Sequence, residues 1–211
     1  MYSLQQTAAP AEEPVTLAEA KLWLRVETSA DDSSISSLVT AARGMIERLS
    51  GRQLVTAQWI LRLDTFPYPN GWWLLEYPGL FPDASCVRIP RAPLQSVEGV
   101  TYYDLGGTLQ TLDPATYDVD AAHDPGRVSL AMNKVWPVTR LKPGAVKIAF
   151  TAGYGNAAAV PEEYKTAIKL TVGAWYENRE AVVTGTIASE LPWSAKALID
   201  SMWNGCLEYG S

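Results

Sequence analysis

The first fifty residues carry apolar side chains at helical spacing. Thr16 and Glu19 stand three residues apart, the spacing of a capping box, in which each side chain bonds the backbone amide of the other residue at a helix start. A second apolar stripe begins after Asp31 and Asp32, either of which can cap it, and ends at Gly51, a residue type that stops helices. Its apolar positions are Ile35, Leu38, Val39, Ala42, Ile46 and Leu49. The pattern predicts two helices joined by a short turn, with one apolar face.

From Val55 the apolar positions change to a period of two residues. Val55, Ala57, Trp59, Leu61 and Leu63 alternate with mostly polar neighbours, which is the pattern of a half-buried strand. Turns containing Gly, Pro and Asp divide the rest of this region into short segments. The further segments predicted as strands are residues 86–89, 97–104, 108–112, 117–119, 127–130 and 145–151.

Helical spacing returns after Pro161, with Glu162 and Glu163 where the helix dipole favours acids. The apolar face that follows consists of Tyr164, Ala167, Ile168, Thr171, Val172, Trp175 and Tyr176, and a last short helix is predicted over residues 193–203. Because the first and last helix pairs each have a single apolar stripe, we expect them to bury these stripes against each other. The predicted fold class is α+β: a small helical bundle formed by the N- and C-terminal helix pairs, with a β-rich antiparallel insertion between them.

This organisation divides the 211 residues into four parts. Residues 1–13 are polar and unpatterned, and we expect a flexible N-terminal arm. Residues 14–54 and 155–203 are predicted to form the helical core, and residues 55–154 the β-rich insertion. Residues 204–211 are predicted to form a C-terminal tail.

Composition and charge narrow the classes of function. The chain is 47% hydrophobic and 19% charged, as an ordinary globular protein is. Its 23 acidic residues outnumber its 17 basic ones, and the net charge of −6 argues against a dedicated nucleic-acid binder, which gains affinity from Lys and Arg at the phosphates. No stretch approaches the ~18 apolar residues of a membrane span and the N-terminus has no signal pattern, so we expect a protein made and used in a cytoplasm.

Residues that carry chemistry are few, and structural roles explain them better. His123 is the one histidine and sits in a turn sequence, and the two cysteines, Cys86 and Cys206, form no metal-binding or disulfide pattern. The glycines of residues 151–155 suit a strand-to-helix turn better than a phosphate loop, because no Lys or Arg stands nearby. Adjacent acids at 12–13, 31–32 and 162–163 suit helix starts better than a catalytic pair. The sequence predicts no enzyme, no metal and no cofactor.

The long loop at residues 65–84 is an unusual part of the chain. It contains four prolines and the aromatic residues Phe66, Tyr68, Trp72, Trp73, Tyr77 and Phe81. A loop of this length and composition is expected to pack against something or to bind something. Stacking on single-stranded nucleic acid or on sugar is open to these side chains, but the acidic balance of the chain favours a protein interface.

A series of short strings runs in a distinctive order from residue 14 to about residue 193. The series includes PVTLAEAK at residues 14–21, IPRAPL at 89–94, FTAGYG at 150–155 and WYENRE at 175–180. The others are residues 24–26, 31–32, 41–43, 51–54, 58–59, 100–104, 117–119, 136–137 and 160–161. In this order the chain resembles the head–tail connector (adaptor) proteins of long-tailed bacteriophages and of gene transfer agents.

The resemblance implies a non-enzymatic ring protein of the virion, at the interface between head and tail. Such adaptors assemble, typically as a dodecamer, on the portal protein and present a surface to a tail-side stopper or tail protein. DNA passes through the central channel without sequence-specific binding, and no membrane is involved. A net negative chain suits such a channel because it repels the phosphate backbone. Assembly is expected in the cytoplasm of the bacterial host.

The resemblance also implies roles for two groups of residues. The C-terminal segment is the expected portal-docking element, with anchors at Trp193, Leu198, Trp203, Leu207 and Tyr209. Closure of a ring needs two different faces on each subunit. The expected subunit interface comprises Trp72, Trp73, Tyr77, Phe81, Arg179 and Glu180. For the last two residues, an ion pair within one chain is an equally open interpretation.

Two other classes of function stay open on the sequence. A carbohydrate-binding accessory module would use the aromatic loop at residues 65–84. A hydrolase would use a carboxylate site in a deep acidic pocket that no motif marks.

Overall fold

The structure is a computed structural model that describes residues 2–67, 80, 85–178 and 192–202. The described residues fall into two compact units. Residues 2–10 and 56–153 form a β unit, and residues 11–55 and 154–202 form a helical unit. The main segment of the β unit and the predicted insertion at 55–154 differ by one residue at each end. The α+β class is confirmed.

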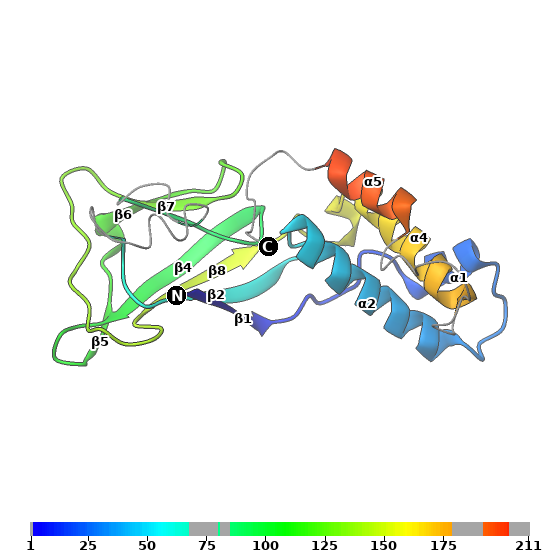
Figure 1. The fold of residues 1–211 in the computed structure, drawn as a ribbon, viewed down its shortest axis with the longest axis horizontal. Coiled ribbons are helices and arrows are strands. Elements are labelled where there is room, and N and C mark those ends of the chain that lie inside the picture. The colour runs from blue at the N-terminus through cyan, green and yellow to red at the C-terminus, as the bar shows by residue number, and fades with distance from the viewer. Residues whose placement is uncertain (1, 68–79, 81–84, 179–191, 203–211) are drawn as a thin grey trace, which may run out of the picture. The chain divides into compact units, whose positions relative to one another are not determined.

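The β unit contains two antiparallel sheets (Figure 1). The larger sheet has the strand order β1-β2-β8-β4-β5, with β1 (Tyr2–Ala8), β2 (Ala57–Leu63), β8 (Val146–Ala152), β4 (Leu94–Tyr103) and β5 (Leu109–Thr111). The smaller sheet has the order β3-β7-β6, with β3 (Cys86–Arg88), β7 (Arg127–Leu130) and β6 (Tyr117–Asp120). All of the segments predicted as strands are confirmed, with ends that differ by at most three residues.

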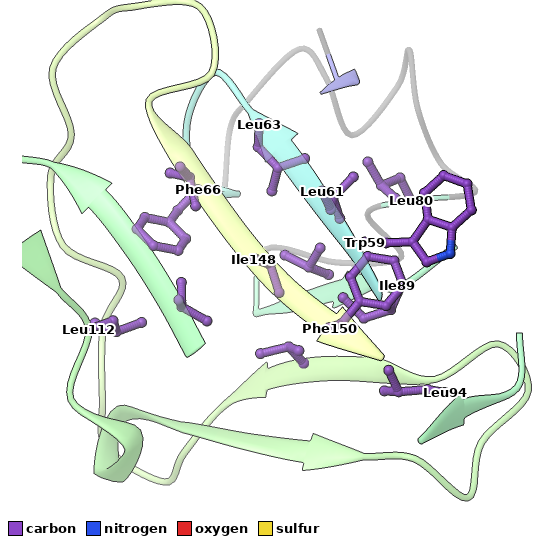
Figure 2. Packing of buried hydrophobic residues seen from close by; sticks show 14 of the residues in the cluster. Trp59, Leu61, Leu63, Phe66, Leu80, Ile89, Leu94, Leu112, Ile148 and Phe150 are labelled. Atoms are coloured by element: carbon purple, nitrogen blue, oxygen red, sulfur yellow. The ribbon is translucent and has the colours of Figure 1, made fainter. Parts of the chain in front are cut away.

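Alternation along β2 and β8 places every second side chain in the core. The buried positions are Ala57, Trp59, Leu61 and Leu63 in β2, and Val146, Ile148, Phe150 and Ala152 in β8. The antiparallel register pairs Leu61 with Ile148, so both sets lie on the same face of the sheet (Figure 2). Val87 and Val128 of the smaller sheet belong to the same hydrophobic cluster. The two sheets therefore share one core.

The prediction of a flexible arm at residues 1–13 is wrong for its first part. Residues 2–8 form the edge strand β1, which pairs with β2 from Tyr2 opposite Leu63 to Ala8 opposite Gln58. Tyr2 and Leu4 pack against the core of the β unit. The hydrophobic pattern did not reveal this strand because only two of its side chains, those of Tyr2 and Leu4, pack against the core. The backbone hydrogen-bonding groups at the edge of β2 hold the rest of β1.

The helical unit consists of α1 (Leu17–Leu24), α2 (Asp32–Ser50), α4 (Glu162–Glu177) and α5 (Trp193–Ser201). One hydrophobic cluster takes residues from all four of these helices, among them Ala20, Ile46, Ile168 and Ile199. None of the helices in the described ranges is long and apolar enough to cross a membrane.

The helix ends agree with the sequence except at two places. The capping box is present, with Thr16 N donating to Glu19 Oε2 at 2.7 Å and Glu19 N donating to Thr16 Oγ1 at 3.2 Å. Gly51 ends α2 with φ of 65°, a conformation that glycine adopts without strain. Asp31 precedes α2 but does not cap it, because its carboxylate accepts from Tyr176 Oη at 2.6 Å instead. The last helix ends at Ser201, short of the predicted end at residue 203.

A buried carboxylate connects the end of α2 to the segment that follows it. Glu47 is 5% exposed and accepts hydrogen bonds from Arg43 Nη1 at 2.9 Å, Gln53 Nε2 at 2.7 Å and Leu54 N at 3.1 Å. Arg43 also donates its Nε to Glu13 Oε2 at 2.7 Å. Burial by itself lowers the pKa of Arg43, but the hydrogen bonds and charges of Glu13 and Glu47 outweigh it, and the net effect is a raised pKa. The network fixes the chain on both sides of α2.

Replacement of Glu47 by Ala is expected to lower the free energy of unfolding by about 3 kcal/mol, because the buried Gln53 Nε2 and Leu54 N and the partly buried Arg43 lose this acceptor. Urea denaturation, followed by circular dichroism, measures this change. Glu27→Ala is the control, since Glu27 is exposed and its loss is expected to change stability by less than about 0.5 kcal/mol. Equal stability of the two variants would contradict the role given to Glu47.

Hydrogen exchange tests whether residues 2–8 form a strand. The amides of β1 that bond to β2 are expected to exchange at least about tenfold more slowly than those of the exposed segment at residues 121–122. Deletion of residues 2–8 is expected to speed the exchange of β2, since the deletion exposes its edge. Exchange of all β1 amides at the rate of an unstructured peptide would restore the flexible-arm interpretation.

Candidate functional site

The paired acids identified in the sequence are engaged in structural contacts. Asp32 Oδ1 accepts from Lys21 Nζ at 2.7 Å, and Glu162 Oε1 accepts from Lys165 Nζ at 2.8 Å. Glu12 Oε1 accepts from Ala157 N at 2.7 Å. Glu13 and Asp31 accept the bonds from Arg43 and Tyr176 described above. Each of the acidic pairs at 12–13, 31–32 and 162–163 therefore has a member in a structural contact. Within the described residues, no group of three His, Cys, Asp or Glu side chains could hold a metal ion.

The glycine-rich string at residues 151–155 is a turn. Gly153 and Gly155 have φ of 130° and 127°, which side chains on L residues rarely tolerate. The amides after it are bonded by the chain itself, with Glu12 on Ala157 N and Asn156 Oδ1 on Ala159 N at 3.1 Å. These bonds occupy two of the three amides of the 3₁₀ turn Ala157–Ala159 that a phosphate site would use.

His123 and Cys86 also have structural positions. His123 Nδ1 lies 2.9 Å from Pro125 O, to which it donates in the tautomer that carries the Nδ1 proton. Its backbone N–H donates to Asp120, which also accepts from Arg127. The hydrogen bonds of Arg127 and of this backbone N–H lower the pKa of Asp120. Cys86 is buried in β3, and Cys206 lies outside the described residues.

The predicted portal-docking anchors divide between described and undescribed residues. In α5, Ala195 and Ile199 are buried in the helical unit, and Leu198 packs partly against its core. Trp193, at the first position of α5, is 83% exposed. Trp203, Leu207 and Tyr209 lie outside the described residues. The helix therefore leaves Trp193 available to a partner.

The predicted subunit interface lies largely outside the described residues. This holds for Trp72, Trp73, Tyr77, Phe81, Arg179 and Glu180. Of the aromatic loop, Phe66 is described and is fully buried, with its ring stacked on Trp136 at a centroid distance of 4.7 Å. Phe66 is thus a core residue of the β unit, which removes it from any sugar-binding surface.

The structure reveals an exposed apolar surface that the sequence analysis missed. The segment 131–142 between β7 and β8 has apolar side chains at every third residue, and all of these are exposed: Met132, Val135, Val138 and Leu141. Trp136 and Thr139 between them are buried. The period of three fits neither a helix nor a strand, so it gave no signal to a search for secondary structure. We refer to residues 131–142 as the apolar loop.

The apolar loop is held to the β unit along its length. Ala131 N donates to Thr116 O at 3.0 Å, and Arg140 N donates to Tyr103 O at 3.1 Å. Thr139 Oγ1 donates to Thr65 Oγ1 at 3.3 Å, and Trp136 stacks on Phe66. Lys142 Nζ lies 4.0 Å from the centre of the Tyr103 ring. These contacts fix the backbone while the apolar side chains point into solvent.

A second exposed apolar surface lies on α1. Leu22 and Trp23 are exposed, and Trp23 contacts α4 beside Gly173. Both residues fall outside the stripe of Leu17, Ala20 and Leu24 that faces the core of the helical unit. Their position outside this stripe was the sequence signal that could have predicted their exposure.

Comparisons with known proteins returned a match to one family model and matches to solved structures. The model of the phage gp6-like head-tail connector protein family matches residues 14–101. No curated protein matches the chain by sequence.

Three solved structures have the same fold over nearly the whole chain. A chain from the neck of an empty gene transfer agent particle, computed with C6 symmetry, has a TM-score of 0.73 at 23% identity, over 99% of this chain and 98% of its own. A chain from the virion of a native gene transfer agent particle has a TM-score of 0.73 at 22% identity, over 98% of each chain. A chain from the neck of a native gene transfer agent particle, computed with C12 symmetry, has a TM-score of 0.68 at 21% identity, over 99% of this chain and 98% of its own.

The sequence match and the structural matches cover different extents of the chain. The family model covers residues 14–101, and the structural matches extend the shared fold through both units. The resemblance is therefore confirmed: residues 14–101 carry the sequence pattern of the phage gp6-like head-tail connector proteins, and the chain has the fold of chains in gene transfer agent neck structures.

Proposed function

We propose that this protein is a structural head–tail connector that forms a ring on the portal, links capsid to tail and lets DNA pass through its channel. The observation that carries the proposal is the family match over residues 14–101. The fold shared with a chain of a neck computed with C12 symmetry supports a ring, and a dodecamer in particular. The helical unit serves as the adaptor core, and the protein resides at the head–tail interface of the virion after assembly in the host cytoplasm.

The polar chemistry of the described residues is consistent with a structural role. The acidic pairs and the glycine-rich string are bonded within the chain, as a scaffold requires. The net charge of −6 suits a wall that DNA passes without adhering, because a negatively charged surface repels the phosphate backbone.

We assign portal docking to the C-terminal segment. In α5 the buried Ala195 and Ile199 fix the helix, and the exposed Trp193 is a large amphipathic side chain of the kind that anchors interfaces. Leu198, Trp203, Leu207 and Tyr209 complete the proposed set of anchors. The next ring on the tail side, a stopper or tail protein, takes the opposite surface.

The subunit interface is assigned to the aromatic loop and to the segment after α4. Trp72, Trp73, Tyr77 and Phe81 supply apolar contact area, and Arg179 with Glu180 supplies a charge pair between neighbours. These assignments follow from the heterologous contact that a ring requires.

Loss of the protein from a producing phage or gene transfer agent is expected to leave filled capsids and tails unjoined. Electron microscopy of lysates counts joined particles, which we expect to fall at least about a hundredfold without the chain and to return when it is supplied from a plasmid. Normal joining without the chain would refute the proposed function.

Deletion of residues 204–211 is expected to abolish attachment to the portal ring while the helical unit stays folded. Co-sedimentation with purified portal measures attachment, and circular dichroism measures folding. Trp193→Ser is expected to weaken attachment about tenfold, because an interface tryptophan carries a large share of binding energy. Leu49→Ser, at an exposed leucine of α2, is the matched control and is expected to attach normally. Unchanged attachment of the deletion variant would refute the docking assignment.

A further inference from the structure

Charge in the β unit is separated along the sequence. Residues 92–126 contain six acidic residues and no Lys or Arg: Glu98, Asp104, Asp113, Asp118, Asp120 and Asp124. Residues 125–153 contain five basic residues and no acidic one: Arg127, Lys134, Arg140, Lys142 and Lys147. Arg127 is ion-paired with Asp120, whereas Lys134, Arg140 and Lys142 belong to the apolar loop itself.

The basic residues of the apolar loop lie between its exposed apolar side chains. Met132 is 88% exposed and Leu141 is 93% exposed, and Lys134, Arg140 and Lys142 are exposed beside them. Single exposed apolar residues are common on protein surfaces, but a fixed loop that presents four of them with three cations is a surface suited to docking. An apolar centre with charged residues around it is the usual composition of a protein interface.

An acidic surface lies on the smaller sheet. β6 is the edge strand of that sheet, and its Asp118 and Val119 are exposed. Asp113, which caps the 3₁₀ turn Pro114–Thr116 immediately before β6, is exposed as well. We refer to Asp113, Asp118 and Val119 as the acidic edge. Within the described residues it offers a strand edge that pairs with no other strand, with the carboxylate of Asp118 on one face of the strand and Val119 on the other.

We propose that the apolar loop of one copy of this chain docks on the acidic edge of a second copy. The loop supplies cations and apolar side chains, and the edge supplies carboxylates and an apolar contact, so the two surfaces are complementary. Within the described part of the chain, no ion pair joins Lys134 or Lys142 to Asp113 or Asp118. Lys142 lies over the Tyr103 ring and Asp113 accepts from Ala115 N, but neither contact neutralises the charge. Two different surfaces on one chain give a head-to-tail contact, the type that closes rings. The inference rests on the proposed function and adds a second contact to the subunit interface assigned there.

Other occupants fit the surface less well. DNA would take the cations of the loop, but it gives no role to four exposed apolar side chains. A bilayer would take apolar and basic residues together, but it gives no role to the acidic edge. A second copy of the chain uses both surfaces.

Carbodiimide cross-linking tests the contact directly, because it joins an amine to a carboxylate that touches it. The full-length chain is mixed in equal amounts with its 15N-labelled form at high concentration, and mass spectrometry identifies links that join a labelled to an unlabelled peptide. We expect intermolecular links from Lys134 or Lys142 to Asp113 or Asp118, and a ladder of products beyond the dimer. Absence of these links, or products that stop at the dimer, would overturn the head-to-tail contact.

Charge reversal gives a second and stricter test. Lys134→Glu with Lys142→Glu makes the loop acidic, and Asp118→Lys replaces one edge carboxylate by a cation. Each variant alone is expected to lose at least about tenfold in self-association affinity. Sedimentation velocity measures this affinity, because the substitutions remove the groups that carbodiimide joins. A mixture of the two variants is expected to regain the affinity, because the basic loop of one variant meets the unchanged acidic edge of the other, and the acidic loop meets the cation placed on the edge. A mixture that stays as weak as its components would overturn the proposal.

Matched leucine variants separate the docking role from a general loss of solubility or folding. Leu141→Ser in the loop is expected to lower intermolecular linking about tenfold, and Leu49→Ser in α2 is expected to leave it unchanged. Equal effects of the two would overturn the proposal. Vesicles or DNA that protect the loop lysines from labelling, without any intermolecular links, would assign the loop to those partners instead. The cross-linking measurements need no portal, so they test this contact separately from the proposed function. If particles without the chain stay unjoined but the intermolecular links lie elsewhere on the chain, this contact is refuted and the proposed function stands.

Discussion

The helical unit depends on contacts between helices that are more than a hundred residues apart in the sequence. Each helix pair has one apolar stripe, and Ile46 of α2 shares its cluster with Ile168 of α4. A pair with an exposed stripe is marginal in water, whereas each fully buried aliphatic side chain contributes about 1.5–3 kcal/mol. Both halves must therefore meet before either is stable, and the long insertion between them has to permit this.

The β unit permits it through the pairing of the first and last strands of the insertion. β2 begins the insertion and β8 ends it, and they are hydrogen-bonded neighbours with Ala57 opposite Ala152. In the helical unit, Tyr154 N donates to Leu54 O at 3.0 Å, so the two ends of that unit also lie side by side. An insertion whose ends are adjacent adds a small loop-closure cost, and Glu47 fixes the exit from α2 through Leu54 N.

The sequence predicted those parts of the fold that a regular hydrophobic period governs. The helices, the buried faces of β2 and β8 and the capping box at Thr16 follow from local pattern and side-chain chemistry. β1 was missed because an edge strand is bound by the backbone of its neighbour and needs few apolar residues. Glu47 was missed because its partners Arg43, Gln53 and Leu54 become a closed set through tertiary structure. Of the predicted docking residues, Trp193 and Leu198 fall in the described part of the chain. Leu198 packs partly against the core and Trp193 is exposed, and the local sequence pattern does not determine this difference.

Exposure is informative here because each unit completes its core without the exposed residues. The β unit buries Trp136 and Thr139 and leaves Met132 and Leu141 in solvent, although all four lie in one fixed loop. A loop selected for the stability of the β unit alone would gain from polar residues at the exposed positions, since large apolar side chains in water promote association. The exposed apolar residues recur every three residues, and the buried Trp136 and Thr139 each follow one of them directly. This pattern matches a loop with one face for the β unit and one face for a partner. The α5 helix has the same division, with Ile199 inward and Trp193 outward. Among the described residues, the two units thus each present apolar side chains that packing within the unit does not use, and the proposed ring subunit would need such surfaces for its neighbours.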